Sequence, residues 1–561
     1  MKPILLLYPP YEGKNLLKSR EPFPTGLLYL AAYLQGKNIK ARVIDFGYPH
    51  TQSFVQRPTE LKTGQAMYKR YGWSDFEIRE WLRENLINYH SIIGVSSLMS
   101  STWNGGYQVC KIIKEINPKS IIVMGGPHAT AFPEHVANKS VADYVCIGEG
   151  EKALYNFIVG DEDENEGIIS TKDIRKGKTI SYERQFISDM DSLPFPDRKL
   201  LLDDRTTDEM VITFSRGCLH NCSFCGSKVI QGRKWRVKSI TRAVDEIKFY
   251  VKNWGVKSFA VEDDNLCPMG RGMEWIKELC QQIIRMYEHK IIPKLKFHVP
   301  HGIPVYATAN KELCSLLWEA GFRNMVFPLE STNPDVLYDM KKEFTPKFYF
   351  EATKNWSKYE TPFPTEIIIG YPFVETIQSM LQTMIDIAGN GGLVWASHFR
   401  LNKGTDLYPR CIESGYAKDS FDPINTQAFA IETERFSITD LEELRQIGRG
   451  INFGIEREIN VFSSKLKNIV AKDYEFVITK LPKIGDVVAT GKFKFKRSQN
   501  VFTNLLLLRL GVNGKSLLSF NEDQDKIIFK GVKNSKVYST LSKMLNKNTK
   551  SRMHSFMKEE L

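Results

Sequence analysis

The sequence predicts an α/β protein in which a doubly wound, Rossmann-like domain precedes a partial (β/α)6 barrel of the TIM type and a small α+β domain. Three observations support this order. Two successive series of short apolar strands alternate with helix-length segments, the strands lack polar alternation, and the pattern loosens after about residue 415. Strands that are apolar on both faces are typical of parallel sheets covered by helices. We expect domains over residues 1–160, 206–415 and 416–561, with a linker over 161–205.

The first domain is predicted from five apolar runs and the helix-length segments between them. A continuous apolar segment over residues 26–34 is long enough for a buried helix, and residues 107–116 place apolar side chains at helical spacing. The strands are expected over residues 4–8, 41–45, 92–96, 121–124 and 144–147. Because ligands bind doubly wound sheets at the carboxyl ends of the strands, the turns after these strands are the candidate binding region.

The second domain is predicted from six further strands, each followed by a helix-length segment. These strands are expected over residues 211–215, 258–262, 296–299, 324–329, 366–370 and 393–399. In barrels of this type the chemical residues lie at the carboxyl ends of the strands. The last domain is predicted from a helix near 439–450, an alternating segment at 491–496 and an apolar run at 505–508.

Composition limits the class of protein. The 561 residues are 42% hydrophobic and 25% charged, and no apolar run approaches the ~18 residues that span a bilayer. The five-residue apolar run at the start is too short for a signal peptide, and nine mostly scattered cysteines argue against a disulfide framework. We therefore expect a cytoplasmic protein. Of the net charge of +12, residues 451–561 contribute most, with 21 Lys and Arg against 10 Asp and Glu. This excess indicates either a partner that carries phosphates or carboxylates, or a solvated lysine-rich surface.

Three cysteines follow the first barrel strand within eight positions: Cys218, Cys222 and Cys225. Structural zinc takes four ligands, usually as two separated pairs, and no second pair follows here. His220 is the one candidate for a fourth ligand in the loop, but so short a segment rarely closes a tetrahedron. A [4Fe–4S] cluster fits better, because three thiolates can hold three irons and leave the fourth open to a non-protein ligand.

With Phe224 before its last cysteine, this loop resembles the cluster loop of the radical S-adenosylmethionine (SAM) superfamily, and the resemblance extends over residues 205–415. It implies that Asp263 and Asp264, at the end of the second strand, receive the SAM ammonium, although carboxylates there could also cap a helix. It also implies that Glu330 and Ser331 bind near the ribose and methionine, and that the turn containing Gly370 lies beside the adenine. At residues 402–405 the sequence NKGT departs from the usual Pro-Gly-Thr, so the role of that loop stays open.

A second resemblance lies in the first domain. Ser96, Ser97 and Leu98 are followed 26 residues later by Gly125 and Gly126, a spacing similar to that of cobalamin-binding domains. Small residues at strand ends would let the nucleotide tail of cobalamin reach the sheet edge. The segments that contain His128, Gly148 and Glu149 are also similar to the cobalamin-binding radical SAM subclass. A structural use of the two glycines as a tight turn is the alternative.

The same resemblance places Gly47 where many such domains have a histidine. We therefore expect cobalamin to bind without a histidine on its lower face, although His50 and His128 are alternative candidates for that position. Gly47 itself belongs to the predicted cobalamin site.

Together these resemblances imply a cobalamin-dependent radical SAM enzyme, and we expect a methyltransferase. By the resemblance, a 5′-deoxyadenosyl radical takes hydrogen from an unactivated carbon, which then receives CH₃ from methylcobalamin, and a second SAM remethylates the cobalamin. The active site should lie where the top of the barrel faces residues 96–102 and 125–128. The sequence does not identify a catalytic residue. Expected partners are a small-molecule or peptide substrate and a flavodoxin- or ferredoxin-type electron donor, without nucleic acid or a membrane span.

Three alternatives stay open. A cyclase or rearrangement enzyme could use the same two cofactors without net methylation. A tRNA-modifying methylthiotransferase would carry a further set of three cysteines in its first domain, whereas residues 1–200 contain Cys110 and Cys146 alone. A non-catalytic cobalamin sensor would not need the cysteine loop.

Overall fold

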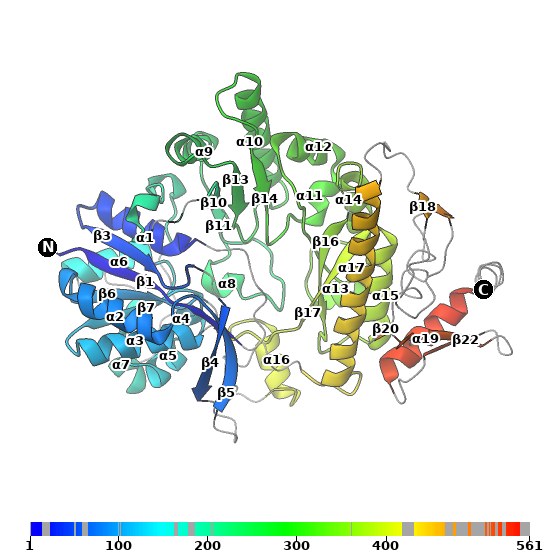
Figure 1. Cartoon of the computed structure of the whole chain (residues 1–561), viewed down its shortest axis with the longest axis horizontal. Helices are drawn as coiled ribbons and strands as arrows, with labels where there is room; N and C mark the ends of the chain where they lie inside the picture. Colours follow the sequence, from blue (N-terminus) through cyan, green and yellow to red (C-terminus); the bar gives the residue numbers. More distant parts are fainter. Residues whose placement is uncertain are drawn as a thin grey trace. The chain divides into compact units, whose positions relative to one another are not determined.

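The computed structural model divides the chain into two compact units, which are Met1–Pro300 with Arg400–Phe429 and His301–Phe399 with Ala430–Leu561 (Figure 1). It describes residues 2–13, 23–49, 52–58, 65–98, 100, 103–161, 167–177, 186–203, 205, 207–360, 362–417, 431–465, 475–477, 492–494, 511–512, 515–516, 518–521, 526–529 and 535–549.

The N-terminal sheet has six strands in the order β3-β1-β6-β7-β8-β9. The first five are parallel, and β9 pairs antiparallel with β8 at the edge. Five parallel strands in this order form a doubly wound sheet, which confirms the predicted fold class. The strands are β1 (Ile4–Tyr8), β3 (Ala41–Asp45), β6 (Ile92–Ser96), β7 (Ile121–Gly125), β8 (Tyr144–Cys146) and β9 (Ile168–Ser170). Because β9 begins at Ile168, the sheet extends past the expected domain end at residue 160.

Helices cover this sheet, as the blue and cyan part of Figure 1 shows. Helix α3 turns one apolar face to the sheet, where Val109, Ile112 and Ile113 are buried. They join a core with Leu5, Leu7, Ile93, Val95 and Ile122. Burying each such side chain stabilises the fold by ~1.5–3 kcal/mol. The helices are α1 (Thr25–Gly36), α2 (Asp75–Asn85), α3 (Trp103–Ile116), α4 (Pro127–Ala131), α5 (Pro133–Lys139), α6 (Gly150–Val159) and α7 (Thr171–Arg175), with 3-10 turns at Leu86–Asn88, Met190–Ser192 and Arg198–Leu200.

A small antiparallel sheet, which the sequence did not predict, is inserted into this domain. Its order is β2-β5-β4, with β2 at Tyr11–Gly13, β4 at Gln52–Pro58 and β5 at Gln65–Tyr71. A buried ion pair anchors it, because Arg70 Nη1 lies 2.9 Å from Glu12 Oε1.

The six strands of the expected barrel form two three-stranded parallel sheets, one in each unit. In the first unit the order is β10-β13-β14, and in the second it is β15-β16-β17. The strands are β10 (Glu209–Ile212), β13 (Ser258–Val261), β14 (Lys296–His298), β15 (Phe327–Glu330), β16 (Phe363–Ile369) and β17 (Gly392–His398). A two-stranded ribbon, β11 (Ser215–Arg216) with β12 (Arg236–Val237), follows β10. The predicted strands are confirmed with their ends shifted by a few residues.

Helices follow these strands as expected from a βα series. In the first unit they are α8 (Ser227–Ile230), α9 (Ile240–Trp254), α10 (Arg271–Glu288) and α16 (Leu407–Glu413). In the second they are α11 (Val305–Ala309), α12 (Lys311–Ala320), α13 (Pro334–Asp339), α14 (Pro346–Trp356) and α15 (Ile377–Gly389). Figure 1 shows both series in green, apart from α16, which is yellow.

The C-terminal region begins with the long helix α17 (Ile438–Lys465) and ends with α19 (Lys536–Thr549). Between them lie β18 (Glu475–Val477), β19 (Lys492–Lys494), β20 (Gly511–Val512), β21 (Lys515–Ser516), β22 (Leu518–Asn521) and β23 (Lys526–Phe529). The expected alternating strand at 491–496 corresponds to β19, whereas the apolar run at 505–508 lies outside the described residues.

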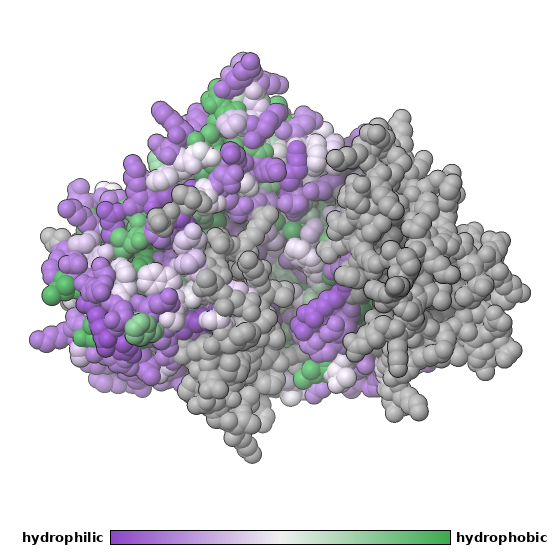
Figure 2. All heavy atoms as spheres, viewed as in Figure 1, coloured by the Kyte–Doolittle hydropathy of each residue, from purple (hydrophilic) through white to green (hydrophobic). Residues whose placement is uncertain are grey.

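The surface is mixed in character. Side chains on the viewed face of the described residues are mostly hydrophilic, with small apolar groups between them (Figure 2). Among the helices that the structure describes, none has the length and apolar content that a membrane crossing requires.

Candidate cofactor site

The cysteine loop is enclosed by the ribbon β11–β12, in which Ser215 pairs with Val237 and Arg216 with Arg236. The loop leaves β11 through Gly217, whose φ is +84°. A Cβ at this position would lie 2.2 Å from the Lys234 carbonyl oxygen. Only glycine fits so close an approach of two backbones.

The three loop cysteines differ from the other six in exposure. Cys218, Cys222 and Cys225 are partly exposed, whereas the others are buried. Burial raises the pKa of buried thiols, to about 12 for Cys267 and to about 11 for Cys314, so these remain neutral. Because the thiolate is the metal ligand, the loop cysteines are the ones suited to bind iron.

Nitrogen donors contact two sulfur atoms of the loop. The backbone N–H of Ser227 donates to Cys225 Sγ at 3.5 Å, and Asn265 Nδ2 donates to Cys218 Sγ at 3.7 Å. Donors of this kind stabilise negative charge on cluster thiolates. Among the described residues, no group of three His, Cys, Asp or Glu is arranged to hold one metal ion. A four-iron cluster needs no such convergence, since each thiolate binds a separate iron.

The NKGT loop at residues 402–405 packs against the cysteine loop. Asn402 Nδ2 donates to the Phe224 carbonyl at 3.4 Å, and the backbone N–H of Leu407 donates to the Ser223 carbonyl at 3.3 Å. Asp406 forms an ion pair with Lys228. Although its sequence departs from Pro-Gly-Thr, the NKGT loop thus contacts and supports the cysteine loop.

Asp263 is turned toward the backbone of its neighbouring strand. Its carboxylate accepts N–H bonds from Phe214 at 2.9 Å and Ser215 at 2.6 Å, while its side chain is 1% exposed. Burial raises the pKa of Asp263 to about 7. Asp264, one residue on, is exposed. Since side chains alternate near a strand end, the two predicted SAM contacts have different surroundings.

The other predicted SAM residues lie in the second unit. Glu330 ends β15 with φ of +68°, and its Oε1 lies 2.9 Å from Lys342 Nζ. Buried Ser331 places its Oγ 3.3 Å from Thr383 Oγ1. Gly370 follows β16 with φ of +81°, which favours glycine.

The carboxyl edge of the N-terminal sheet is built from small residues. Ser97 donates its N–H to the Gly125 carbonyl at 2.7 Å, and its own carbonyl accepts from His128 N at 3.1 Å. Gly126 has φ of +108°, and a Cβ there would lie 2.8 Å from the Ser97 carbonyl oxygen. The predicted spacing of Ser96–Leu98 and Gly125–Gly126 therefore corresponds to one packed corner.

A small hollow of about 10 Å³, enough for one water molecule, opens at this edge, lined by Tyr8, Pro9, Pro10, Tyr11, Ser96, Ser97, Leu98 and Gly106. The hydroxyl oxygen of Ser97 is buried and has no hydrogen-bond partner among the described residues. A buried hydroxyl without a partner is costly, so a polar ligand group would satisfy it. The corner therefore offers a polar group that the described residues leave unsatisfied.

Of the two histidines considered for the lower face of cobalamin, the structure describes His128. His128 is 1% exposed, and its ring nitrogens lie 2.8 Å from Ser100 Oγ and 3.1 Å from His135 Nδ1. Both nitrogens are thus engaged within the protein. Burial lowers the pKa of His128 well below its ordinary value. His50 lies outside the described residues.

At Gly47, where a histidine was expected in related domains, there is little room. A Cβ there would lie 3.0 Å from Asp45 Oδ1 and 3.3 Å from the Tyr11 ring. Asp45 is in turn paired with Arg205 at 2.8 Å. Burial raises the pKa of Asp45 to about 6 despite this cation. The glycine therefore fits the packing of this turn.

Gly148 and Glu149, the last predicted cobalamin residues, form the turn between β8 and α6. Gly148 donates its N–H to Thr130 Oγ1 at 2.9 Å. The Glu149 carboxylate instead contacts the protein, since Oε2 accepts from Ile187 N at 2.7 Å and Oε1 lies 2.7 Å from Arg236. Asn265, in the same turn as Asp263, also contacts the segment after the cysteine loop, since Trp235 Nε1 donates to its carbonyl at 3.0 Å.

Comparison with known families gives two matches that together span most of the two predicted cofactor domains. The family model described as B12 binding domain matches residues 20–158. The model of the Radical SAM superfamily matches residues 212–387.

Individual proteins agree with these matches. The chain is 27% identical over 448 residues to the cytidylyl-2-hydroxyethylphosphonate methyltransferase of Streptomyces wedmorensis, covering 70% of this chain and 78% of that protein. It is 24% identical over 328 residues to the anaerobic magnesium-protoporphyrin IX monomethyl ester cyclase of Rubrivivax gelatinosus, covering 49% and 57%. Its fold is similar to that of the radical SAM methyltransferase TsrM of Kitasatospora setae, solved with tryptophan and a SAM analogue. The TM-score is 0.57 at 15% identity, covering 81% of this chain and 89% of that one.

Proposed function

Because the chain belongs to the cobalamin-binding radical SAM enzymes, we propose that it is a methyltransferase that acts on an unactivated carbon of a small molecule or a peptide. The observation that carries the proposal is the presence, within one unit, of a partly exposed three-thiol loop and a sheet corner with an unpartnered Ser97 hydroxyl. The similarity to a named methyltransferase over 70% of the chain supports methyl transfer as the outcome.

The residues of the chain would bind and orient three groups: a [4Fe–4S] cluster, SAM and cobalamin. When bound, the cluster with SAM supplies a carbon-centred radical and cobalamin supplies a methyl group. Cys218, Cys222 and Cys225 would hold the cluster. The Ser96–Leu98 segment with Gly125, Gly126 and the backbone at Gly148 would hold cobalamin, where a side chain at Gly126 would block the corner.

For SAM, we propose that Asp264, Glu330, Ser331, Gly370 and Phe224 make the contacts. Asp263 would act as a positioning residue, because its oxygens already accept bonds from Phe214 and Ser215. In that role it joins the end of β13 to the start of the cysteine loop. His128 would shape the cobalamin site through packing, since its nitrogens are engaged.

Further parts of the proposal rest on the sequence. An external flavodoxin- or ferredoxin-type protein would supply the electron. The basic region after residue 415 would recognise the substrate, and the scattered free cysteines suit a cytoplasmic location. Cobalamin would bind without a histidine below it, since Gly47 replaces the expected residue.

A second candidate function is a cyclisation or rearrangement with the same two cofactors, which the similarity to the cyclase favours. Product analysis separates the two. The purified, reconstituted chain is incubated anaerobically with SAM, a reductant and a candidate substrate. We expect S-adenosylhomocysteine and 5′-deoxyadenosine to form together, because methyl transfer consumes two SAM molecules. Formation of 5′-deoxyadenosine alone with an altered substrate would overturn the methyltransferase proposal in favour of the second candidate.

A further inference from the structure

The ribbon that encloses the cysteine loop is too small to hold itself together. Strands β11 and β12 contribute two residues each, and Arg216 pairs directly with Arg236 across the ribbon. An isolated two-stranded ribbon is marginal in water, and like charges directly opposite each other destabilise it further. The closed ribbon therefore depends on groups outside it.

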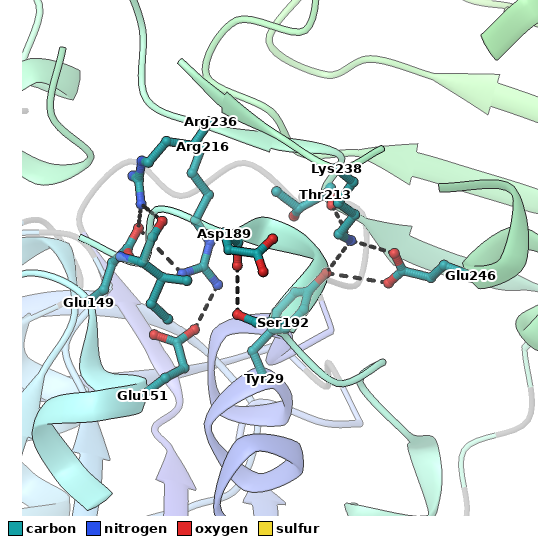
Figure 3. A network of polar contacts seen from close by, with 11 residues as sticks. Tyr29, Glu149, Glu151, Asp189, Ser192, Thr213, Arg216, Arg236, Lys238 and Glu246 are labelled. Carbon is teal, nitrogen blue, oxygen red and sulfur yellow. Dashed lines mark hydrogen bonds and ion pairs between the residues drawn. The ribbon is translucent and has the colours of Figure 1, made fainter. Parts of the chain in front are cut away.

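Two carboxylates of the N-terminal domain supply what the ribbon lacks. Glu149 Oε1 lies 2.7 Å from Arg236 Nη1 and 3.4 Å from Arg216 Nη1. Glu151 Oε1 lies 2.7 Å from Arg216 Nη2. Figure 3 shows the two glutamates beneath the two arginines, with dashed contacts between them. Two negative charges thus balance the two positive charges of the ribbon.

This ion network is buried, which makes its geometry specific. The exposed fractions of the four side chains are 10% for Arg216, 7% for Glu149 and Arg236, and 5% for Glu151. Buried charges need nearly complete pairing, because each one left alone carries its full desolvation cost. All four charged side chains are therefore paired in one relative position of the ribbon and the turn before α6. Apolar contacts between the same two segments would allow one segment to slide along the other.

A second buried contact fixes the ribbon on its other side. Lys238, just after β12, donates to Tyr29 Oη at 2.9 Å and to the Thr213 carbonyl at 2.6 Å, and it pairs with Glu246 (Figure 3). Tyr29 lies in α1, and its ring also lies under the Arg216 guanidinium. The N-terminal domain therefore contacts the ribbon through both α1 and the turn after β8.

We propose that Glu149 and Glu151 are positioning residues for the iron–sulfur cluster, closing the ribbon around the cysteine loop from the cobalamin-binding domain. This inference rests on the proposed function only in that the loop holds a cluster. It gives Glu149 a role different from the cobalamin contact that the sequence suggested. It also makes retention of the cluster depend on a domain that contributes none of the three cysteines.

The test measures iron rather than turnover. Reconstituted wild-type chain and the double variant Glu149→Gln/Glu151→Gln are mixed anaerobically with a ferrous chelator, and iron release is followed with time. Cobalamin binding is measured on the same samples as a check that the N-terminal domain is folded. We expect iron release to be at least several-fold faster in the variant, with cobalamin binding within twofold of wild type. Equal release rates, or lost cobalamin binding with normal iron retention, would overturn the inference.

Two further variants sharpen the result. Glu12→Gln removes an equally buried carboxylate, paired with Arg70, and should leave iron release at the wild-type rate. Adding Arg236→Gln to Glu149→Gln removes the repulsion between the arginines and should slow iron release again. If Glu149→Gln/Glu151→Gln fails to fold, the comparison of Glu149→Gln with Glu149→Gln/Arg236→Gln tests the inference instead. Iron release that is no slower in the second of these variants contradicts the inference. A wild-type chain that binds no iron would overturn the proposed function as well, whereas iron binding with equal release rates overturns this inference alone.

Discussion

The side-chain amide of Asn265 donates to the sulfur of Cys218 across 3.7 Å. Asn265 follows the barrel strand β13, whereas Cys218 follows the ribbon strand β11, so a single buried side chain joins the end of a barrel strand to the cysteine loop. Its orientation is fixed, because Oδ1 accepts the backbone N–H of Cys267 at 3.2 Å and leaves the NH₂ group facing the sulfur. This contact gives the protein a means to adjust the charge on one cluster ligand.

Replacing Asn265 with Leu should lower the reduction potential of the cluster. An N–H···S bond favours the more negative, reduced cluster, so its loss favours the oxidised one. A bond of about 1 kcal/mol corresponds to roughly 40 mV for one electron. A redox titration monitored by electron paramagnetic resonance measures the midpoint. Asn253→Leu, at an exposed asparagine of α9, serves as the control, and equal midpoints in both variants would contradict the assignment.

Replacing Cys222 with Ala should remove the visible sulfide-to-iron absorption while cobalamin still binds. Two thiolates hold a four-iron cluster poorly, whereas the cobalamin corner at Ser97 and Gly126 does not involve this loop. Anaerobic absorption spectra with iron and cobalt analysis measure both cofactors. Cys314→Ala removes a buried, neutral thiol elsewhere and should keep the absorption. Full iron content in Cys222→Ala would show that the loop is not the cluster site.

Replacing Gly126 with Ala should weaken cobalamin binding more than tenfold. The positive φ costs an L-residue ~1–2 kcal/mol, and the new methyl group would also press on the Ser97 carbonyl, 2.8 Å away. Gly160→Ala is the control for a positive φ without crowding, because Gly160 has φ of +75° with open space around its Cβ position. Titration with cobalamin compares the two. If both variants lose affinity equally, backbone strain alone explains the effect and the corner is not the binding site.

The sequence was a good guide wherever the signal was local. Continuous apolar runs predicted all five parallel strands of the first sheet, and cysteine spacing predicted the loop that is partly exposed in the structure. The inserted β2-β5-β4 sheet was missed because its strands carry polar residues and pair across long separations. The short edge strand β9 was missed for a different reason, since three residues give no periodicity to detect.

Side-chain partners were harder to predict than strands. Asp263 and Asp264 were both predicted to contact SAM, but which carboxylate faces the ligand depends on the alternation of side chains after β13. Asp263 and Asn265 turned out buried, and Asp264 exposed. Likewise the pairing of Glu149 with Arg236 joins residues far apart in sequence, and no local sequence pattern predicts it.

Glu375, in the turn that follows β16, should make the stability of the second unit depend on pH. Its carboxyl group is 1% exposed and accepts the Tyr371 N–H at 2.8 Å, and burial raises the pKa of Glu375 to about 8. An unfolded glutamate has its ordinary, lower pKa, so between the two values the folded state binds the extra proton. Stability from this group is therefore complete below the unfolded pKa and is lost as pH rises through 8, by about 5 kcal/mol in all. Glu375→Gln keeps the acceptor oxygen but cannot ionise. We expect the melting temperature of this variant to fall less than that of wild type between pH 5 and 8, and to exceed it at pH 8.

Glu351→Gln, at an exposed position of α14, should follow the wild-type curve. Parallel curves for Glu375→Gln and wild type would mean that the carboxyl group ionises freely in the folded turn.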